Sequence, residues 1–245
     1  KAFTNDGISI KAENFEYNKI LTTLISDGNV ELRDSKKNII IKANKILYSK
    51  NNEIIIAEKD VELKDLKKNI LIKADKISYF KDQEKIIANK EVELKDLELE
   101  TIIRGDEISY FKKEEKIIAN KEVELIDNKK DIFINTDRIT YLKQKEKIFT
   151  EGKTIASIHS KYNFFSKNVT FLKNEMELSS SYKTIITDNT GSSYEVENFN
   201  FQIKKEFLKA SNISVIQNTA AKIGESERLF FESGFFDLKN KNFKT

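Results

Sequence analysis

The chain has 245 residues, and its 43 lysines and arginines nearly balance its 40 aspartates and glutamates, giving a formal net charge of +3 at pH 7. This balance, without a basic tract, argues against a nucleic-acid-binding protein. Charged residues form 34% of the chain but alternate with isoleucine, valine and leucine, which argues against disorder. The absence of cysteine excludes disulfides and thiolate metal sites within this span.

Proline is also absent, and two explanations fit equally well. Long β-ladders exclude proline because it cannot donate a backbone hydrogen bond, and a composition rich in lysine, isoleucine and asparagine is poor in proline without any structural cause. No apolar run approaches the roughly 18 residues that a membrane-spanning helix needs. The first residue is lysine and no signal peptide is recognisable, so we expect the span to be a piece of a longer protein.

A 31-residue unit is repeated five times from the N-terminus to about residue 156. Each copy has a six-residue motif that ends in tyrosine, and these tyrosines are Tyr17, Tyr48, Tyr79, Tyr110 and Tyr141. A second motif recurs at the same spacing, as in Gly28–Leu32, Lys59–Leu63, Lys90–Leu94 and Lys121–Leu125. A fixed period of this length indicates one supersecondary unit stacked on copies of itself. We therefore expect a function spread along a groove, and a catalytic pocket is the less favoured arrangement.

Within a unit, apolar residues alternate with polar ones, which is typical of half-buried antiparallel strands. The odd spacing between Ala74 and Ile77 predicts a β-bulge or bend, because the alternation must slip there to keep one face inward. Polar turns separate the alternating segments, so each unit is about three short strands or two long bent ones. The predicted turns are residues 34–38, 49–53, 65–69, 81–84, 112–115 and 127–131.

The fold class that follows is all-β, an antiparallel structure built from 31-residue repeats. Alternation places Lys73, Asp75, Glu93 and Arg104 outward. The inward columns supply the candidate groove-lining residues, which are Ile41, Ile46, Ile72, Ile77, Val92, Ile103, Ile108, Val123, Ile134 and Ile139.

After residue 157 the copies become less regular, but phenylalanine recurs at a spacing of 30 residues, at Phe171, Phe201 and Phe231. We see no firm boundary and predict a single domain over residues 1–245. It has regular repeats in residues 1–156 and a divergent, phenylalanine-rich continuation in residues 157–245.

Little in the sequence points to chemistry. His159 is the sole histidine, so no histidine-based triad or multi-histidine metal site can form. The recurring carboxylates pair with lysines across turns and are expected on a solvated outer face. Gly28 and Gly152 stand where other copies have lysine, which suggests an ordinary φ at that position. The tyrosine column is expected to be a packing ladder; we predict no enzyme, no cofactor and no metal.

The motifs Ala74–Tyr79 and Gly28–Leu32 resemble those of the OstA-like family of lipopolysaccharide-transport β-jellyrolls, which includes LptA, LptC and the N-terminal periplasmic domain of LptD. The resemblance covers about residues 8 to 156, and residues 166–179 and 230–237 look more like the LptD N-terminal region. The LptD cysteines that pair with its barrel region are absent. A trimmed LptD and a stand-alone LptA-like bridge therefore both remain open.

The resemblance implies an elongated, half-open jellyroll in the periplasm of a Gram-negative bacterium, associated with the outer membrane. Its apolar interior would shield the lipid A acyl chains of lipopolysaccharide. The implied partners are lipopolysaccharide, other β-jellyroll Lpt proteins joined through edge strands, and an outer-membrane barrel. The rival interpretation is a structural or adhesive β-solenoid with a dry, closed core and no lipid ligand.

Overall fold

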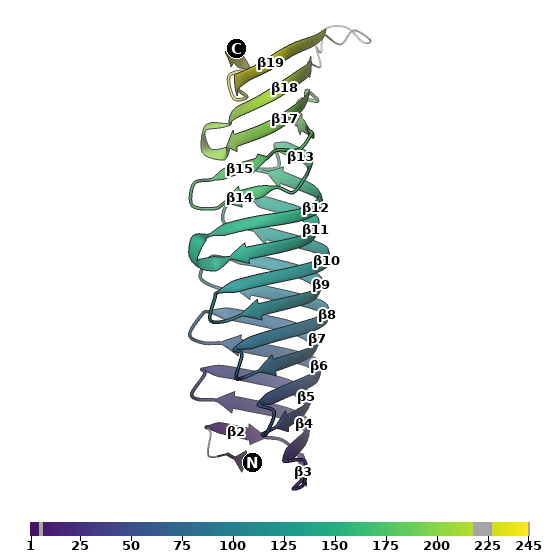
Figure 1. Ribbon diagram of the computed structural model, residues 1–245, viewed down its shortest axis with the longest axis vertical. Helices are drawn as coiled ribbons and strands as arrows, with labels where there is room; N and C mark the ends of the chain where they lie inside the picture. The colour runs from purple at the N-terminus through teal and green to yellow at the C-terminus, as the bar shows by residue number, and fades with distance from the viewer. Residues whose placement is uncertain (5–6, 218–226, 245) are drawn as a thin grey trace. The chain divides into compact units, whose positions relative to one another are not determined.

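The computed structural model describes residues 1–4, 7–217 and 227–244. These residues form twenty β-strands and two short 3-10 helices (Figure 1). No helix in the described part of the chain is both long and apolar enough to cross a membrane. The chain divides into two compact units, residues 1–123 and 124–245, and each unit is described below by itself.

The first unit is a stack of antiparallel strands in which each long strand pairs with the next along the chain. Its strands are β1 (Ala2–Phe3), β2 (Ile8–Lys11), β3 (Asn14–Asn18), β4 (Thr23–Asp34), β5 (Ile39–Ser49), β6 (Ile54–Asp65), β7 (Ile70–Phe80), β8 (Lys85–Asp96), β9 (Thr101–Phe111) and most of β10 (Lys116–Asp127). Each repeat thus contributes two long strands, which is one of the two arrangements that the sequence allowed.

The second unit begins in the last residues of β10 and is also antiparallel. Its elements are β11 (Ile132–Leu142), η1 (Lys143–Lys145), β12 (Lys147–Ile158), β13 (Tyr162–Lys167), β14 (Thr170–Leu172), β15 (Glu177–Ser180), β16 (Thr184–Asp188), β17 (Ser193–Gln202), η2 (Ile203–Lys205), β18 (Phe207–Gln217), β19 (Glu227–Asp237) and β20 (Asn242–Lys244). The prediction of an all-β fold of antiparallel strands built from 31-residue repeats is confirmed.

The turns form where the sequence predicts them, and their residue types explain why. In the turn between β6 and β7, the Asp65 carboxylate accepts hydrogen bonds from the backbone N–H groups of Lys67 and Lys68 at 3.1 and 3.2 Å. Asn69 closes the turn with a φ of 53°, a left-handed conformation that asparagine tolerates better than most residues. The aspartate side chain therefore accepts hydrogen bonds from turn N–H groups that have no carbonyl partner in a strand.

The predicted bulge lies in the middle of each repeat. Glu58 of β6 pairs with Lys76 of β7, but the next pair is Val61 with Ala74, so two residues of β6 face one residue of β7. Inward-facing Ala74 and Ile77 are both buried, because the register slips between them. The bulge prediction is therefore confirmed.

The prediction of an ordinary φ at the glycine-or-lysine position is wrong. This position opens the bulge and lies in the left-handed region in every copy, with φ values of 81° at Gly28, 66° at Lys59, 66° at Lys90, 64° at Lys121 and 88° at Gly152. The bulge imposes this backbone conformation whatever the side chain is, and lysine occupies it at an energetic cost that glycine avoids.

The strands of the second unit become irregular after β12. Two short strands, β13 and β14, both pair with β12, and β15 and β16 both pair with β17. The rings of Phe164 and Phe199 stack at 5.4 Å between centroids, and Phe201 lies 5.1 Å from Phe164. Aromatic packing thus fills the interior where the aliphatic columns end. The predicted single domain, with its change of character at residue 157, stays a prediction.

Candidate functional site: the apolar interior and its charged seam

The ten candidate groove-lining residues all lie inside the fold. Each is at most 2% exposed, from Ile41 to Val123 in the first unit and at Ile134 and Ile139 in the second. Lys73, Asp75 and Arg104 are exposed on the outer face, as alternation predicts. That the ten residues line a lipid groove stays a prediction.

In the first unit, direct cross-strand neighbours form continuous apolar rows. One row crosses five strands through Ile41, Leu63, Ile72, Leu94 and Ile103. A second row alternates large and small side chains and runs through Ile46, Ala57, Ile77, Ala88 and Ile108. Each residue touches the next at the close spacing of antiparallel pairs. These two rows therefore form an unbroken aliphatic surface without a polar side chain.

The tyrosines form a third row with isoleucine between them. Tyr48, Tyr79 and Tyr110 are buried and alternate with Ile55 and Ile86 across β5 to β9. Tyr141 is buried in the second unit, whereas Tyr17 at the end of the stack is 61% exposed. For Tyr48, Tyr79 and Tyr110 in the first unit the structure has the predicted packing ladder.

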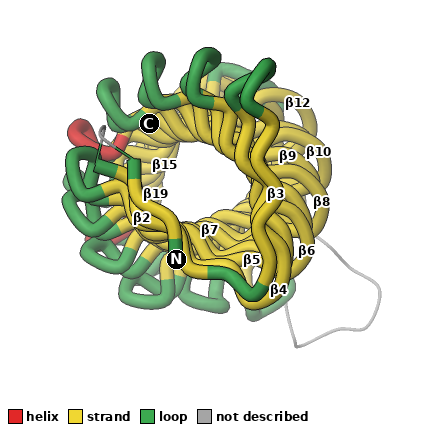
Figure 2. Tube along the Cα trace, turned by 90° about the horizontal axis from the view of Figure 1, so that it is seen from below, coloured by secondary structure: helices red, strands yellow, loops and turns green. Residues whose placement is uncertain are grey.

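A charged seam closes the interior of the first unit. The strands curve (Figure 2), and turns at their opposite ends come into contact. The buried Asp65, the last residue of β6, lies 3.1 Å from the Nζ of the buried Lys112, from the turn after β9. Lys81 and Asp34 make the same kind of contact at 3.9 Å, one repeat earlier. We call these contacts the inner row of the seam.

An outer row of ion pairs covers the inner row. Lys37 pairs with Glu84, and Lys68 pairs with Glu115. The hydrogen bond from Lys37 holds the pKa of Glu84 below its ordinary value. Lys112 also donates to the backbone carbonyl of Lys37 at 3.0 Å, so one lysine holds two successive turns of the opposite side.

The tyrosine row ends against this seam. The hydroxyl of Tyr110 donates to Asp65 over 3.5 Å. Burial, together with the nearby carboxylates, raises the pKa of Tyr110 and of Tyr79. The phenols therefore stay neutral, and they separate the aliphatic rows from the ion pairs.

The second unit carries contacts of the same type. Lys173 lies 2.9 Å from Asp127 with both side chains buried, and Lys130 donates to the backbone carbonyl of Lys173 at 2.6 Å. Burial, followed by repulsion from Lys173, lowers the pKa of Lys130. Further along, Glu206 accepts hydrogen bonds from Lys161 and from the Tyr162 hydroxyl.

The expectation that the recurring carboxylates are solvated is wrong for one column. Asp34, Asp65, Asp96 and Asp127 are each 1% exposed. Their position gives the reason, because each continues the inward alternation of its strand, as Asp65 follows Val61 and Leu63. The same parity places Lys81 after Ile77 and Tyr79, so the signal was present in the sequence.

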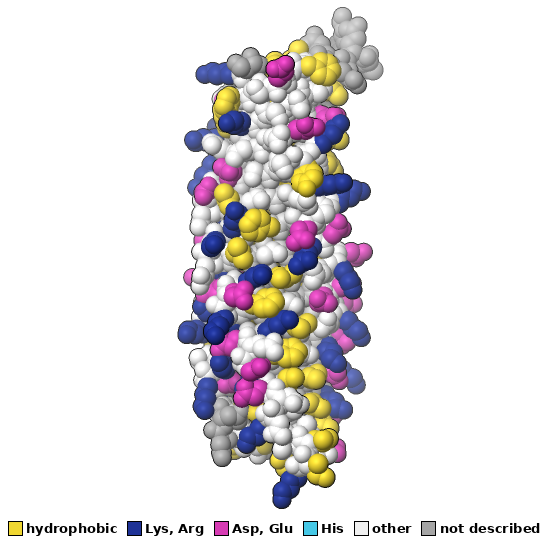
Figure 3. Space-filling model, viewed as in Figure 1, with side chains coloured by type: hydrophobic (Ala, Val, Ile, Leu, Met, Phe, Trp, Pro, Cys, Tyr) yellow, Lys and Arg dark blue, Asp and Glu magenta, His cyan; other side chains and the backbone are white. Residues whose placement is uncertain are grey.

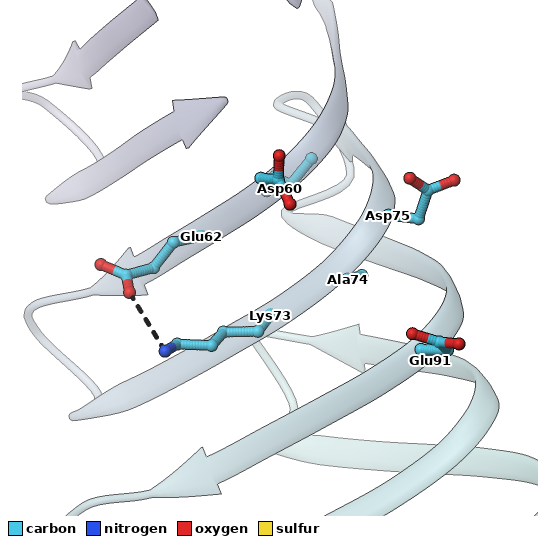
Figure 4. A pocket seen from close by; sticks show the side chains of 7 residues that line it. Asp60, Glu62, Lys73, Ala74, Asp75 and Glu91 are labelled. Carbon is cyan, nitrogen blue, oxygen red and sulfur yellow. Dashed lines mark ion pairs between the residues drawn. The ribbon is translucent and has the colours of Figure 1, made fainter. Parts of the chain in front are cut away.

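The outer face offers hollows at the bulges but no evident chemistry. One of them has a volume of about 390 Å³ and is lined by Asp60, Glu62, Lys73, Asp75 and Glu91, among others. In Figure 4 the Lys73 side chain extends toward Glu62, and the two lie 3.7 Å apart. No group of acidic or histidine side chains that could hold a metal ion is found among the described residues. Charges of both signs intersperse over the face in Figure 3, with hydrophobic side chains between them.

Part of the chain matches a known protein family. Residues 9–116 match the family model described as LptA/(LptD N-terminal domain) LPS transport protein. The matched residues all lie within the first unit. The resemblance to OstA-like lipopolysaccharide-transport proteins that the sequence suggested is thereby confirmed.

Among solved structures, the chain is similar to LptH of Pseudomonas aeruginosa, described as the LptA homologous periplasmic component of the lipopolysaccharide transport device. The sequence identity is 13%, the alignment covers 61% of this chain and 87% of that chain, and the TM-score is 0.26. The search of curated proteins found no match.

Proposed function

We propose that this chain is a periplasmic lipopolysaccharide-transport module whose apolar interior shields lipid A acyl chains on the way to the outer membrane. The observation that carries the proposal is the coincidence of the family match with the unbroken aliphatic rows, which run through Ile72 and Ile77 inside the matched residues. Ten stacked interior residues are available along the strands. Because no position among them is singled out, a lipid can shift along the rows.

The physical gain from such an interior is large. Each CH₂ group removed from water contributes ~0.8 kcal/mol, so an acyl chain of about a dozen carbons gains on the order of 10 kcal/mol. No directed polar contact is needed for that gain. A long aliphatic surface therefore suits a carrier that must release its cargo as well as bind it.

The exposed end of the stack supports the proposal that other jellyroll modules are partners. In β3 every residue is exposed, including Phe15 and Tyr17, and its pairing is with β4. An uncovered strand edge with apolar side chains is suited to β-augmentation by a second sheet. A photo-crosslinker at Tyr17 should capture a second jellyroll module, whereas one at the mid-stack Lys73 should not.

One observation favours the rival function, a structural β-solenoid with a dry core. The ten candidate residues are at most 2% exposed, which also describes a core that never opens. The two functions differ in whether apolar chains ever reach these side chains.

Binding in solution tests the proposed function. A fluorescent acyl probe that brightens in apolar surroundings should bind the purified protein, and lipopolysaccharide should displace it. Free polysaccharide without acyl chains should not compete. A folded protein that fails to bind the probe or lipopolysaccharide would leave the structural solenoid as the better account.

A further inference from the structure

The sealed interior raises the question of how a lipid reaches it. Ile72 and Ile103 are both 0% exposed, so access needs a part of the first unit to open. The sheet itself is a poor place, since β6, β7 and β8 pair along their lengths on both sides of the bulges. Parting two such strands would break a ladder of backbone hydrogen bonds.

The seam is held in a different way. On one side, successive turns are joined by backbone hydrogen bonds, from Leu66 N–H to the Asn38 carbonyl at 3.0 Å and from Leu97 N–H to the Asn69 carbonyl at 2.9 Å. The other side has the same kind of bond, from Lys112 N–H to the Glu84 carbonyl at 3.0 Å. On each side of the seam, backbone hydrogen bonds thus link the successive turns into one continuous edge.

The contacts described across the seam all involve side chains. Lys37–Glu84 and Lys68–Glu115 form the outer row, and Lys112 reaches Asp65 and the Lys37 carbonyl in the inner row. Side-chain rotations can separate such contacts while the backbone ladders stay intact. The Lys37–Glu84 pair is partly exposed, with side-chain exposures of 36% and 26%, so water can take over its hydrogen bonds. In the second outer pair Lys68 is 29% and Glu115 only 11% exposed.

We propose that this seam is the lateral access site for an amphiphile with several acyl chains and an anionic headgroup. The ion pairs part, the chains pass sideways onto the aliphatic rows, and the headgroup stays at the seam. Lys37 and Lys68 then donate their hydrogen bonds to the anionic headgroup and no longer to Glu84 and Glu115. This inference rests on the proposed function and adds a route to it, since chains could otherwise enter at the ends of the stack.

Locking the seam tests the route. The chain has no native cysteine, so introduced thiols react alone. In a variant carrying K37C, E84C, K68C and E115C, a bismaleimide with a reducible spacer should bridge each former ion pair. Peptide mapping would verify the bridges. The rate of lipopolysaccharide binding should fall about ten-fold or more on bridging and return after the spacer is reduced, because binding needs the seam to open.

A matched control bridges ion pairs on the outer face. The variant carrying E62C, K73C, E93C and R104C joins β6 to β7 and β8 to β9, where Glu62–Lys73 and Glu93–Arg104 are cross-strand pairs. Bridging there should leave the binding rate unchanged. Before any bridging, the seam variant should still bind lipopolysaccharide, because the aliphatic rows are unchanged, and its binding rate is the reference for the bridged form.

The outcomes separate the two claims. If the bridged seam variant binds lipopolysaccharide as fast as its reduced form, chains enter elsewhere and the seam inference is wrong, while the proposed function stands. If neither the wild-type protein nor any unbridged variant binds, the proposed function fails, and the seam inference fails with it.

Discussion

Lys112 and Asp65 come from different repeats, yet the Nζ of Lys112 lies 3.1 Å from the Asp65 carboxylate with both side chains buried. Removing two charges from water costs desolvation free energy. The attraction between the two charges offsets this cost, together with the hydrogen bond from Lys112 to the Lys37 carbonyl. Each such pair fixes which turns meet across the seam. The seam therefore specifies the register of the curved stack.

Removing one member of this pair should destabilise the protein strongly. The substitution Asp65→Leu leaves the buried Lys112 without its carboxylate, and we expect a loss of about 3 kcal/mol in the free energy of unfolding. Urea unfolding followed by circular dichroism measures it. The double variant D65L/K112M, which removes both charges, should recover most of the loss. Equal destabilisation by the single and double variants would contradict the coupling.

The outer row should make stability depend on pH at the acidic end. The pKa of Glu84 is held below its ordinary value by Lys37, so ionised Glu84 stabilises the fold above that value. This contribution is lost as the pH falls through the lowered, folded-state pKa. We expect Lys37→Gln to lower the free energy of unfolding by about 0.5 to 1 kcal/mol at neutral pH. The difference from the wild-type protein should vanish well below the pKa of Glu84, and a difference that persists there would contradict this assignment.

The bulge predicts a stabilising substitution. Lys90 is held at a φ of 66°, which costs a non-glycine residue on the order of 1 to 3 kcal/mol, whereas glycine adopts it freely. After the entropic cost of glycine in the unfolded chain, Lys90→Gly should gain about 1 kcal/mol. Thermal unfolding checks this. Lys95→Gly, in the regular part of the same strand, should instead lose about 1 kcal/mol; a loss in both variants would show that the bulge stores no strain.

Two adjacent isoleucines test the inward register. Ile103 is 0% exposed, whereas Ile102 is half-buried on the outer face. Ile103→Ala should cost about 3 to 4 kcal/mol because it leaves a cavity, and Ile102→Ala should cost about 1 kcal/mol. Denaturant unfolding of both variants gives the comparison. Similar losses at the two positions would mean that the inward face is assigned wrongly.

The fold could be predicted from the sequence largely because alternation in a repeated unit has one consistent solution. Once Ile72 and Ile77 face inward, every equivalent residue does, and the slip between Ala74 and Ile77 requires the bulge. The backbone conformation of the bulge could not be found the same way. A lysine at a left-handed φ, such as Lys59, looks no different in sequence from a lysine in a regular strand.

The seam was missed for another reason. Asp65 and Lys112 both lie on the inward parity of their strands, but a charge there suggests a buried pair only if a partner is within reach. That partner comes from another repeat and approaches only after the strands curve. Local alternation carries no information about curvature, so the sequence predicted the rows but not the contacts that close them.

Site-specific photo-crosslinking at neighbouring residues tests most directly whether lipopolysaccharide reaches the apolar interior. A photo-reactive side chain at Ile103, in the middle of an aliphatic row, should capture lipopolysaccharide, and so should one at Ile72. The same side chain at the adjacent, outward-facing Arg104 should not. Capture at Ile103 without capture at Arg104 is expected if acyl chains occupy the interior. No capture at Ile103 or Ile72 in a protein that remains folded would contradict it.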